Sequence, residues 1–325
     1  MPKLANIQIL RFIAAILVFY SHLVTRLELF HGPGRTEFWR QSATLGSYGV
    51  DIFFVISGFV ISQSYAKKKS SPKVFILNRL FRIYPLYAFV TTIFYISHLF
   101  FENSVDLSQF SFKHYFASMF FVSQALTFGY PIIPQGWTLE LEIVFYLVFL
   151  LSIVLSLLFR IANNKEKLLS SITILTLVAT GSPSILIEFI FGFVLASIWV
   201  KFRRKRVTYL VAIYIFISIF YIVKMQPNHM RVLFIGSIAT GFVYLAIVLP
   251  QVPGKLAIFL GNISYGVYLF HGIIIGTILQ FGPPFIGNSA IVVSITSVVT
   301  VIVISTLSYI YFEKPILYWS KTKWF

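Results

Sequence analysis

Long apolar stretches recur from the first line of the sequence to the last, and they constrain the fold more than any other feature. Each runs for about 17–25 residues, long enough for a helix to cross the hydrocarbon core of a membrane. Only 11% of the 325 residues are charged and 58% are hydrophobic, whereas a soluble domain has about 25% charged residues. We therefore expect an all-α integral membrane protein.

The apolar stretches predict ten membrane-spanning helices, at 7–27, 45–65, 77–101, 137–159, 168–183, 185–200, 207–224, 232–249, 257–281 and 289–312. The segment 114–128 is also apolar, but an eleventh span there would reverse the side of every later loop. We expect this segment to form an interfacial or re-entrant helix. Residues 1–325 then make a single transmembrane domain with no extracytoplasmic soluble domain.

The basic residues predict the orientation of these helices. They cluster in short segments between apolar stretches, at "KKKSSPK" (67–73), "RIANNKEK" (160–167) and "KFRRKR" (201–206). With both termini inside, 20 of the 26 Lys and Arg residues lie on the cytoplasmic side, as the positive-inside rule requires. The net charge of +16 therefore indicates membrane topology and attraction to anionic lipids rather than a nucleic-acid partner.

The stretch "RFIAAILVFYSH" places Arg11 and His22 inside the first predicted span. Eleven residues at about 100° each return to within about 20° of the same direction, so both side chains lie on one helix face, about 16 Å apart along the axis. With the N-terminus inside, Arg11 lies toward the cytosol and His22 toward the other side. An alternative is that Arg11 extends to the inner headgroups and His22 bonds a neighbouring helix.

Two carboxylates are expected at the depth of His22. Asp51 lies about six residues from the outer end of its span, and Glu142 five residues into the span that starts at 137. A carboxylate beside a histidine suits a general base, because it orients the imidazole and raises its basicity. Glu140 is about 200° around the helix from Glu142 and should face elsewhere. The alternative is an ion pair that only holds helices together.

Further polar groups lie on other predicted spans. Arg79 and Arg82 in "NRLFRIYP" share a helix face near the cytoplasm, where two guanidinium groups suit a phosphorylated ligand. Tyr84 could stack on an aromatic base there, although ordinary positive-inside anchoring explains the arginines equally well. His271 lies past the middle of its span. The arrangement suits either a phosphorylated donor from the cytosol with an acceptor hydroxyl from outside, or an anion or proton-coupled transporter.

Several motifs of soluble enzymes and of metal sites are missing from the chain. The sequence has no P-loop, no dinucleotide fingerprint and no HExxH motif, and it contains no cysteine. Disulfides, thiolate metal sites and a cysteine acyl carrier are thus excluded. We expect no metal and no tightly bound cofactor.

Five blocks in order resemble the membrane-bound acyltransferase 3 family. They are Arg11 and His22 with ten residues between them, "GVDIFFVISGFVIS" (49–62), "NRLFRIYPLY", "GWTLELEIVFYL" with Glu142, and "FLGNISYGVYLFH" with His271 followed by "FEKPI" (312–316). Thr138 stands where the family usually has serine. The resemblance covers nearly the whole chain and is closest to stand-alone exopolysaccharide and O-antigen O-acetyltransferases, which lack the SGNH domain of other members.

The resemblance implies transfer of an acyl group, most often acetyl, from cytoplasmic acyl-CoA to a hydroxyl group of a cell-surface or exported carbohydrate. Acetyl-CoA would be a co-substrate in a bacterial cytoplasmic membrane. The residues assigned to this reaction are His22 as general base, supported by Glu142 or Asp51, and Arg11 beside the thioester. Arg79, Arg82 and Tyr84 are assigned to CoA, and Trp137 and His271 to the acceptor. The alternatives are an exporter of polysaccharide or lipid-linked sugar and a proton-coupled transporter.

Overall fold

The computed structural model describes residues 4–31, 37–68, 71–100, 111–159, 165–202, 204–225, 231–252, 254–287 and 289–324, and every regular element in these ranges is a helix. The elements are α1 (Ala5–His31), α2 (Glu37–Ser47), α3 (Gly49–Lys68), α4 (Pro72–Phe100), α5 (Phe112–Met119), α6 (Gly136–Leu158), α7 (Glu166–Ala179), η2 (Ser184–Leu186), α8 (Ile187–Ile198), α9 (Lys205–Met225), α10 (Arg231–Val248), α11 (Lys255–Phe281), α12 (Pro283–Ile286), α13 (Ala290–Ser308), η3 (Tyr309–Glu313) and α14 (Lys314–Trp324). The all-α prediction is confirmed for this part of the chain.

Each of the ten predicted spans coincides with a helix. Within the described ranges, six helical stretches are long and apolar enough to cross a membrane: Ala5–Phe30, Trp39–Ala66, Pro72–Ser97, Gly136–Leu158, Lys255–Phe281 and Ala290–Lys323. Two shorter apolar helices, Ser184–Ile198 and Val232–Val248, lie among them. The chain is therefore an integral membrane protein, while the number ten and the N-in, C-in orientation stay predictions.

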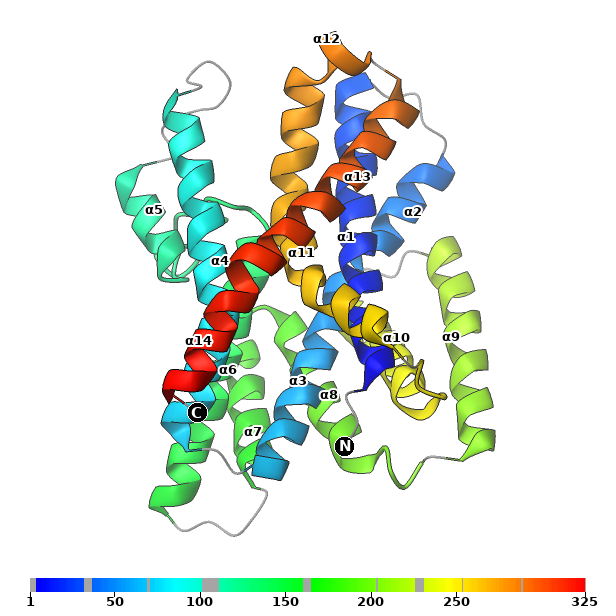
Figure 1. Cartoon of the computed structure of the whole chain (residues 1–325). Coiled ribbons are helices and arrows are strands. Elements are labelled where there is room, and N and C mark those ends of the chain that lie inside the picture. Colours follow the sequence, from blue (N-terminus) through cyan, green and yellow to red (C-terminus); the bar gives the residue numbers. More distant parts are fainter. Residues whose placement is uncertain are drawn as a thin grey trace.

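Helix α1 occupies the middle of the bundle. It packs most extensively against α11 and also contacts α2, α3 and α10. The ends of α3, α6 and α8 that lead into the three basic segments lie at the same end of the molecule as the N-terminus (Figure 1). This common end agrees with the orientation that the basic residues predict.

Helices α3 and α8 pack with their backbones close together. A Cβ atom on Gly58 would collide with the carbonyl oxygen of Phe189, and one on Gly192 would lie 2.6 Å from the amide nitrogen of Phe59. Small residues at a helix interface allow this close approach. In a membrane, helices associate through such van der Waals packing, because lipid provides no hydrophobic driving force between them.

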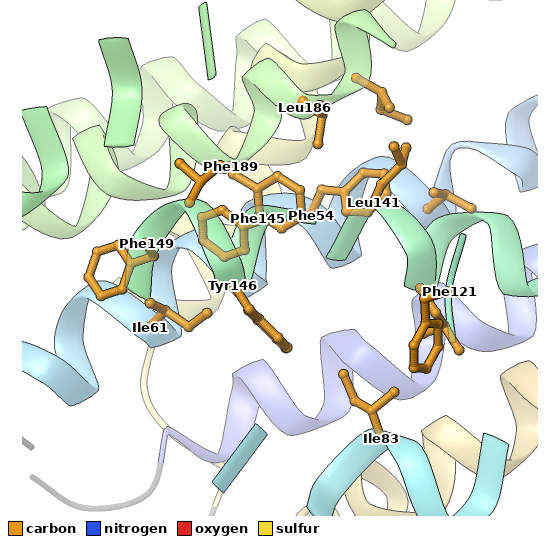
Figure 2. Packing of buried hydrophobic residues seen from close by; sticks show 14 of the residues in the cluster. Phe54, Ile61, Ile83, Phe121, Leu141, Phe145, Tyr146, Phe149, Leu186 and Phe189 are labelled. Atoms are coloured by element: carbon orange, nitrogen blue, oxygen red, sulfur yellow. The ribbon is translucent and has the colours of Figure 1, made fainter. Parts of the chain in front are cut away.

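Aromatic side chains fill the space between α3, α6 and α8. Figure 2 shows Phe54, Phe145, Phe149 and Phe189 gathered in this cluster. The rings of Phe145 and Phe189 stack with centroids 3.8 Å apart and an interplanar angle of 13°. Both side chains are fully buried, so this cluster fixes the position of α6 and of the polar residues that it carries.

The segment between α4 and α6 differs from the expected helix over 114–128. Its helix, α5, covers only eight residues and ends at Met119, about 12 Å, which is too short to cross a membrane. The chain then folds back through turns whose last part is buried, with Ile132 2% and Ile133 0% exposed. Irregular backbone at this position is stable because protein atoms satisfy its polar groups: the hydroxyl of Ser118 accepts from the amide of Ile132 at 2.8 Å.

A π-helical turn, η3, joins α13 and α14 into one long helix that crosses the front of the bundle diagonally (Figure 1). Such turns insert an extra residue into the helix and occur frequently at functional sites. Here the turn brings Tyr309 within 2.7 Å of the side-chain amide of Asn262 on α11. It also directs α14 toward α4, which it contacts.

A methyl group added at the α3–α8 contact should destabilise the fold. We expect Gly192→Ala to lower the free energy of unfolding by about 1–3 kcal/mol. The added Cβ would overlap backbone atoms of α3, which cannot move aside as a side chain can. Thermal unfolding of the detergent-solubilised protein measures this effect.

Gly276→Ala is the matched control, since no atom lies within 4 Å of a Cβ at Gly276 of α11. Equal melting temperatures for the two variants would contradict the role assigned to the close approach.

Candidate active site

The two polar residues of α1 differ in burial and lie at different positions along the helix. Arg11 is partly buried and lines a small cavity, whereas His22, three turns further along, remains accessible and lies beside the ring of His271. The structure thus separates a cationic position from a histidine position along one face of α1, as the spacing of eleven residues predicts.

The cavity at Arg11, here called the inner chamber, has a volume of about 60 Å³. Its walls come from four helices and consist of Arg11, Val50, Phe53, Phe54, Ile56, Ser57, Thr138, Leu139, Glu142, Tyr265 and Tyr268. Glu142 accepts a hydrogen bond from Ser57 at 2.9 Å and another from the hydroxyl of Tyr146. Arg11 lines the same chamber, which therefore holds both an arginine and a carboxylate.

Glu140 and Glu142 point in different directions and do different work. Glu140 is 4% exposed, and its two oxygens accept from the backbone amides of Ser123 at 2.8 Å and Gln124 at 3.2 Å. It therefore fastens the turns that precede α6, while Glu142 faces the inner chamber. The separation of about 200° that the sequence predicts is confirmed.

A larger cavity, here called the basic cavity, lies beyond Arg79 and Arg82 of α4. Its volume is about 600 Å³, and it is lined by Gln8, Val60, Ser64, Tyr65, Phe75, Asn78, Arg79, Arg82, Ile258, Asn262, Tyr309, Lys314, Leu317, Tyr318 and Lys321. Four of these residues are cationic and, among the described residues that line it, none is a carboxylate. Such a cavity favours a polyanion with an aromatic or polar part.

Tyr146 contacts one residue of the basic cavity and one residue of the inner chamber. The guanidinium of Arg79 lies over its ring at 5.9 Å from the centroid, and its hydroxyl donates to Glu142. Arg79 and Arg82 line the basic cavity and Arg11 lines the inner chamber, so arginine side chains border both cavities.

His22 and His271, here called the histidine pair, lie at the other end of the site with ring centroids 5.0 Å apart. His271 is fully buried, and its Nδ1 lies 2.6 Å from the carbonyl oxygen of Tyr268. The hydroxyl of Tyr268, a residue of the inner chamber, is 2.6 Å from that of Thr138. Polar contacts thus run from the chamber to the histidine pair through α11.

The structure places a second histidine beside His22: the rings of His22 and His271 have centroids 5.0 Å apart. Glu142 lines the inner chamber together with Arg11, and its role beside His22 stays a prediction. Asp51 is fully buried in the first turn of α3, where the helix dipole favours a carboxylate, and its role beside His22 stays a prediction.

Tyr84 and Trp137 also lie outside the cavities described above. Tyr84 packs against Phe121 with ring centroids 6.3 Å apart, while the tyrosines that line the basic cavity are Tyr65, Tyr309 and Tyr318. Trp137 packs against the aromatic core. Their roles in binding CoA and the acceptor remain predictions.

Several residues of the site carried no assignment from the sequence. Lys314 and Lys321 were assigned only to the cytoplasmic side, yet both line the basic cavity. Tyr268 precedes His271 by one helical turn, a spacing that would have pointed to a shared face. Ser57 and Tyr146, the partners of Glu142, sit within the quoted blocks "GVDIFFVISGFVIS" and "GWTLELEIVFYL" but gave no separate signal.

The fold and the site define an integral membrane protein whose ionisable side chains line interior cavities instead of facing lipid, which is typical of functional sites in membranes. The family model Acyl_transf_3, described as an acyltransferase domain, matches residues 4–310. The chain belongs to this family and is an acyltransferase. The resemblance drawn from the five sequence blocks is confirmed.

Individual relatives agree with this family. The exopolysaccharide production protein ExoZ of Rhizobium meliloti (strain 1021) is 28% identical over 310 residues, covering 89% of this chain and 94% of ExoZ. ORF330 of Acidianus two-tailed virus, named provisionally as an acetyltransferase, is 25% identical over 74% of this chain and 79% of its own length. SACOL0978 of Staphylococcus aureus (strain COL), named provisionally as an O-acetyltransferase, is 24% identical over 85% of this chain and 53% of its own length. No solved structure matches this chain significantly.

Neutralising the two glutamates of α6 should affect different properties of the protein. We expect Glu140→Gln to lower the free energy of unfolding by about 1–3 kcal/mol, because it weakens two charge-assisted hydrogen bonds to buried backbone. Glu142→Gln should mainly lower the rate of acyl transfer, since the amide oxygen still accepts from Ser57 while the negative charge beside Arg11 in the inner chamber is lost. Thermal unfolding and the transfer rate, measured on both variants, test this division. A more stable Glu140→Gln protein would contradict it.

Proposed function

We propose that this protein is an O-acyltransferase that moves an acyl group, most simply acetyl, from cytoplasmic acyl-CoA to a hydroxyl group of an exported carbohydrate. One observation carries the proposal: a basic cavity at the predicted cytoplasmic end and a histidine pair toward the other end are joined by polar residues through the inner chamber. The family supplies the reaction class, and the exopolysaccharide role in the name of the relative ExoZ supports a carbohydrate acceptor.

The basic cavity is the proposed site for the phosphates of CoA. Arg79 and Arg82 lie on its α4 wall and Lys314 and Lys321 on its α14 wall, so phosphates bound between them would be contacted from both sides. Tyr65, Tyr309 and Tyr318 offer rings for the adenine. The pantetheine arm would then extend past Tyr146 and Arg11 toward the histidine pair.

His22 is the proposed general base. Its imidazole takes the proton of the acceptor hydroxyl as the oxygen attacks the thioester carbonyl carbon, and the carbon–sulfur bond then breaks. The proton passes from the imidazolium to the departing thiolate, so the products are the carbohydrate ester and free CoA. Direct transfer is the simpler route; an acyl-histidine intermediate is the other. Radiolabelled acyl group retained on the purified protein without acceptor would contradict direct transfer.

An exporter of polysaccharide or lipid-linked sugar is the second function considered. The match to an acyltransferase family over residues 4–310 supports the enzyme over the exporter.

Replacing His22 separates these two functions. We expect His22→Ala to reduce acyl transfer by about 10²–10⁴-fold, because the general base is lost, while the polysaccharide still reaches the cell surface. Structural analysis of the surface polysaccharide from cells with the wild-type protein, with the variant and without the protein measures both ester content and polymer yield, and it identifies the acyl group. Polymer that fails to appear outside the cell would support the exporter instead.

The α14 wall of the basic cavity predicts how the donor binds. We expect Lys321→Gln to raise the KM for acetyl-CoA about three- to tenfold, because one charge-assisted contact to a phosphate is lost, with little change in kcat. The effect should shrink at high salt, where exposed charges are screened.

Lys323→Gln serves as the matched control on the same helix. Lys323 lies over the ring of Trp319, 5.0 Å from its centroid, and is not among the residues that line the cavity. Equal KM values for the two lysine variants would exclude the α14 wall from donor binding.

A further inference from the structure

Gln135 is the last residue before α6, and the mechanism described above does not use it. Its side chain is 7% exposed and lies beside the histidine pair, with Nε2 at 3.4 Å from Nε2 of His271. Its backbone carbonyl accepts hydrogen bonds from the hydroxyls of Thr138 and Tyr268, both at 3.1 Å. The side-chain amide of Gln135 is therefore buried against His271, the neighbour of the proposed base His22, and this position requires an explanation.

The hydrogen bonds of His271 fix the orientation of this amide. The carbonyl oxygen of Tyr268, 2.6 Å from Nδ1, accepts hydrogen bonds but cannot donate one. Nδ1 therefore carries the proton, and Nε2 of the neutral imidazole presents a lone pair. Only the NH₂ end of Gln135 can donate to that lone pair, so Oε1 points the other way.

Oε1 of Gln135 is buried and has no hydrogen-bond partner among the described residues. A buried acceptor without a donor destabilises a protein, since it has given up its hydrogen bonds to water, and such a group in a native structure requires an explanation, of which a catalytic or ligand-binding role is one. The acceptor here lies on the amide that contacts His271, the immediate neighbour of His22.

Gly272 makes room for the amide. A Cβ atom built on Gly272 would overlap Nε2 of Gln135, so any side chain at this position would displace the amide. The residue that follows His271 on α11 thus provides the space in which the Gln135 amide sits.

We propose that Gln135 positions the carbohydrate acceptor: Oε1 accepts a hydrogen bond from one hydroxyl group of the acceptor while a second hydroxyl of the same molecule faces His22. This rests on the proposed O-acyltransferase function. It specifies the acceptor as a compound with at least two hydroxyl groups, one bound as a donor and one acylated. Gln135 is then a residue that determines acceptor specificity, and His271 orients it.

The test uses the purified full-length protein, acetyl-CoA and the polysaccharide of the producing cell, freed of its esters by mild base. Gln135→Met keeps the volume of the side chain and removes both hydrogen-bonding groups. We expect its melting temperature to equal or exceed that of the wild type, because the unsatisfied acceptor is gone. The KM for acetyl-CoA should stay within about twofold, while the transfer rate falls at least about 20-fold, roughly the loss of one substrate hydrogen bond to a buried group.

A second pair of variants tests the position of the amide without removing it. Gly272→Ala should lower the transfer rate in the same way, since the added methyl group displaces Gln135. Gly276→Ala, one turn along α11 with open space around its Cβ, should behave as the wild type.

Three results would overturn the proposal. One is a Gln135→Met protein that transfers acetyl at the wild-type rate. Another is a variant whose lost activity comes with a lower melting temperature and a raised KM for acetyl-CoA, which is the behaviour of a purely structural residue. The third is a wild-type protein that transfers no acetyl group, and this result alone also refutes the proposed function.

Discussion

Glu142 of α6 accepts hydrogen bonds from Ser57 of α3 and Tyr146 of its own helix, and it faces Arg11 of α1 across a small chamber. The rest of the site depends on this arrangement. An arginine in a membrane needs a carboxylate or water, and a carboxylate needs donors. Satisfying both requirements draws α1, α3 and α6 together, with the arginines of α4 on one side of the chamber and Tyr268 of α11 on the other. The apolar helices supply the framework, and the polar residues determine which faces meet.

Helical geometry explains which parts of the site the sequence could predict. The direction of Arg11 and His22 follows from 100° per residue, and the opposite roles of Glu140 and Glu142 follow from the same arithmetic. Both predictions concern residues on one helix, where the backbone fixes their relation. The ten predicted spans coincide with helices for a similar reason, because length and composition are local properties of the chain.

The parts of the site that the sequence could not predict depend on where helices begin and on which helices pack together. Residues 120–135 form turns that are mostly exposed, with Ile132, Ile133 and Gln135 buried close to α6, so the depth of Glu142 could not be counted from a membrane surface. No local pattern indicates that Gln135 lies beside His271, 136 residues away in sequence. Likewise, the lysines of α14 reach the basic cavity only because the π turn directs α14 toward α4. In each case a long-range contact decided the position of the side chain.

The packing of α1 against α11 has a consequence for how the protein is made. The first helix emerges from the ribosome with Arg11 and His22 in it, yet its main partner is separated from it by more than two hundred residues of chain. Arg11 meets Glu142 once α6 is in place, but His22 must stay hydrated or covered by other means until α11 brings His271 beside it. We therefore expect α1 to be free to move against its neighbours in the membrane until α11 has been inserted.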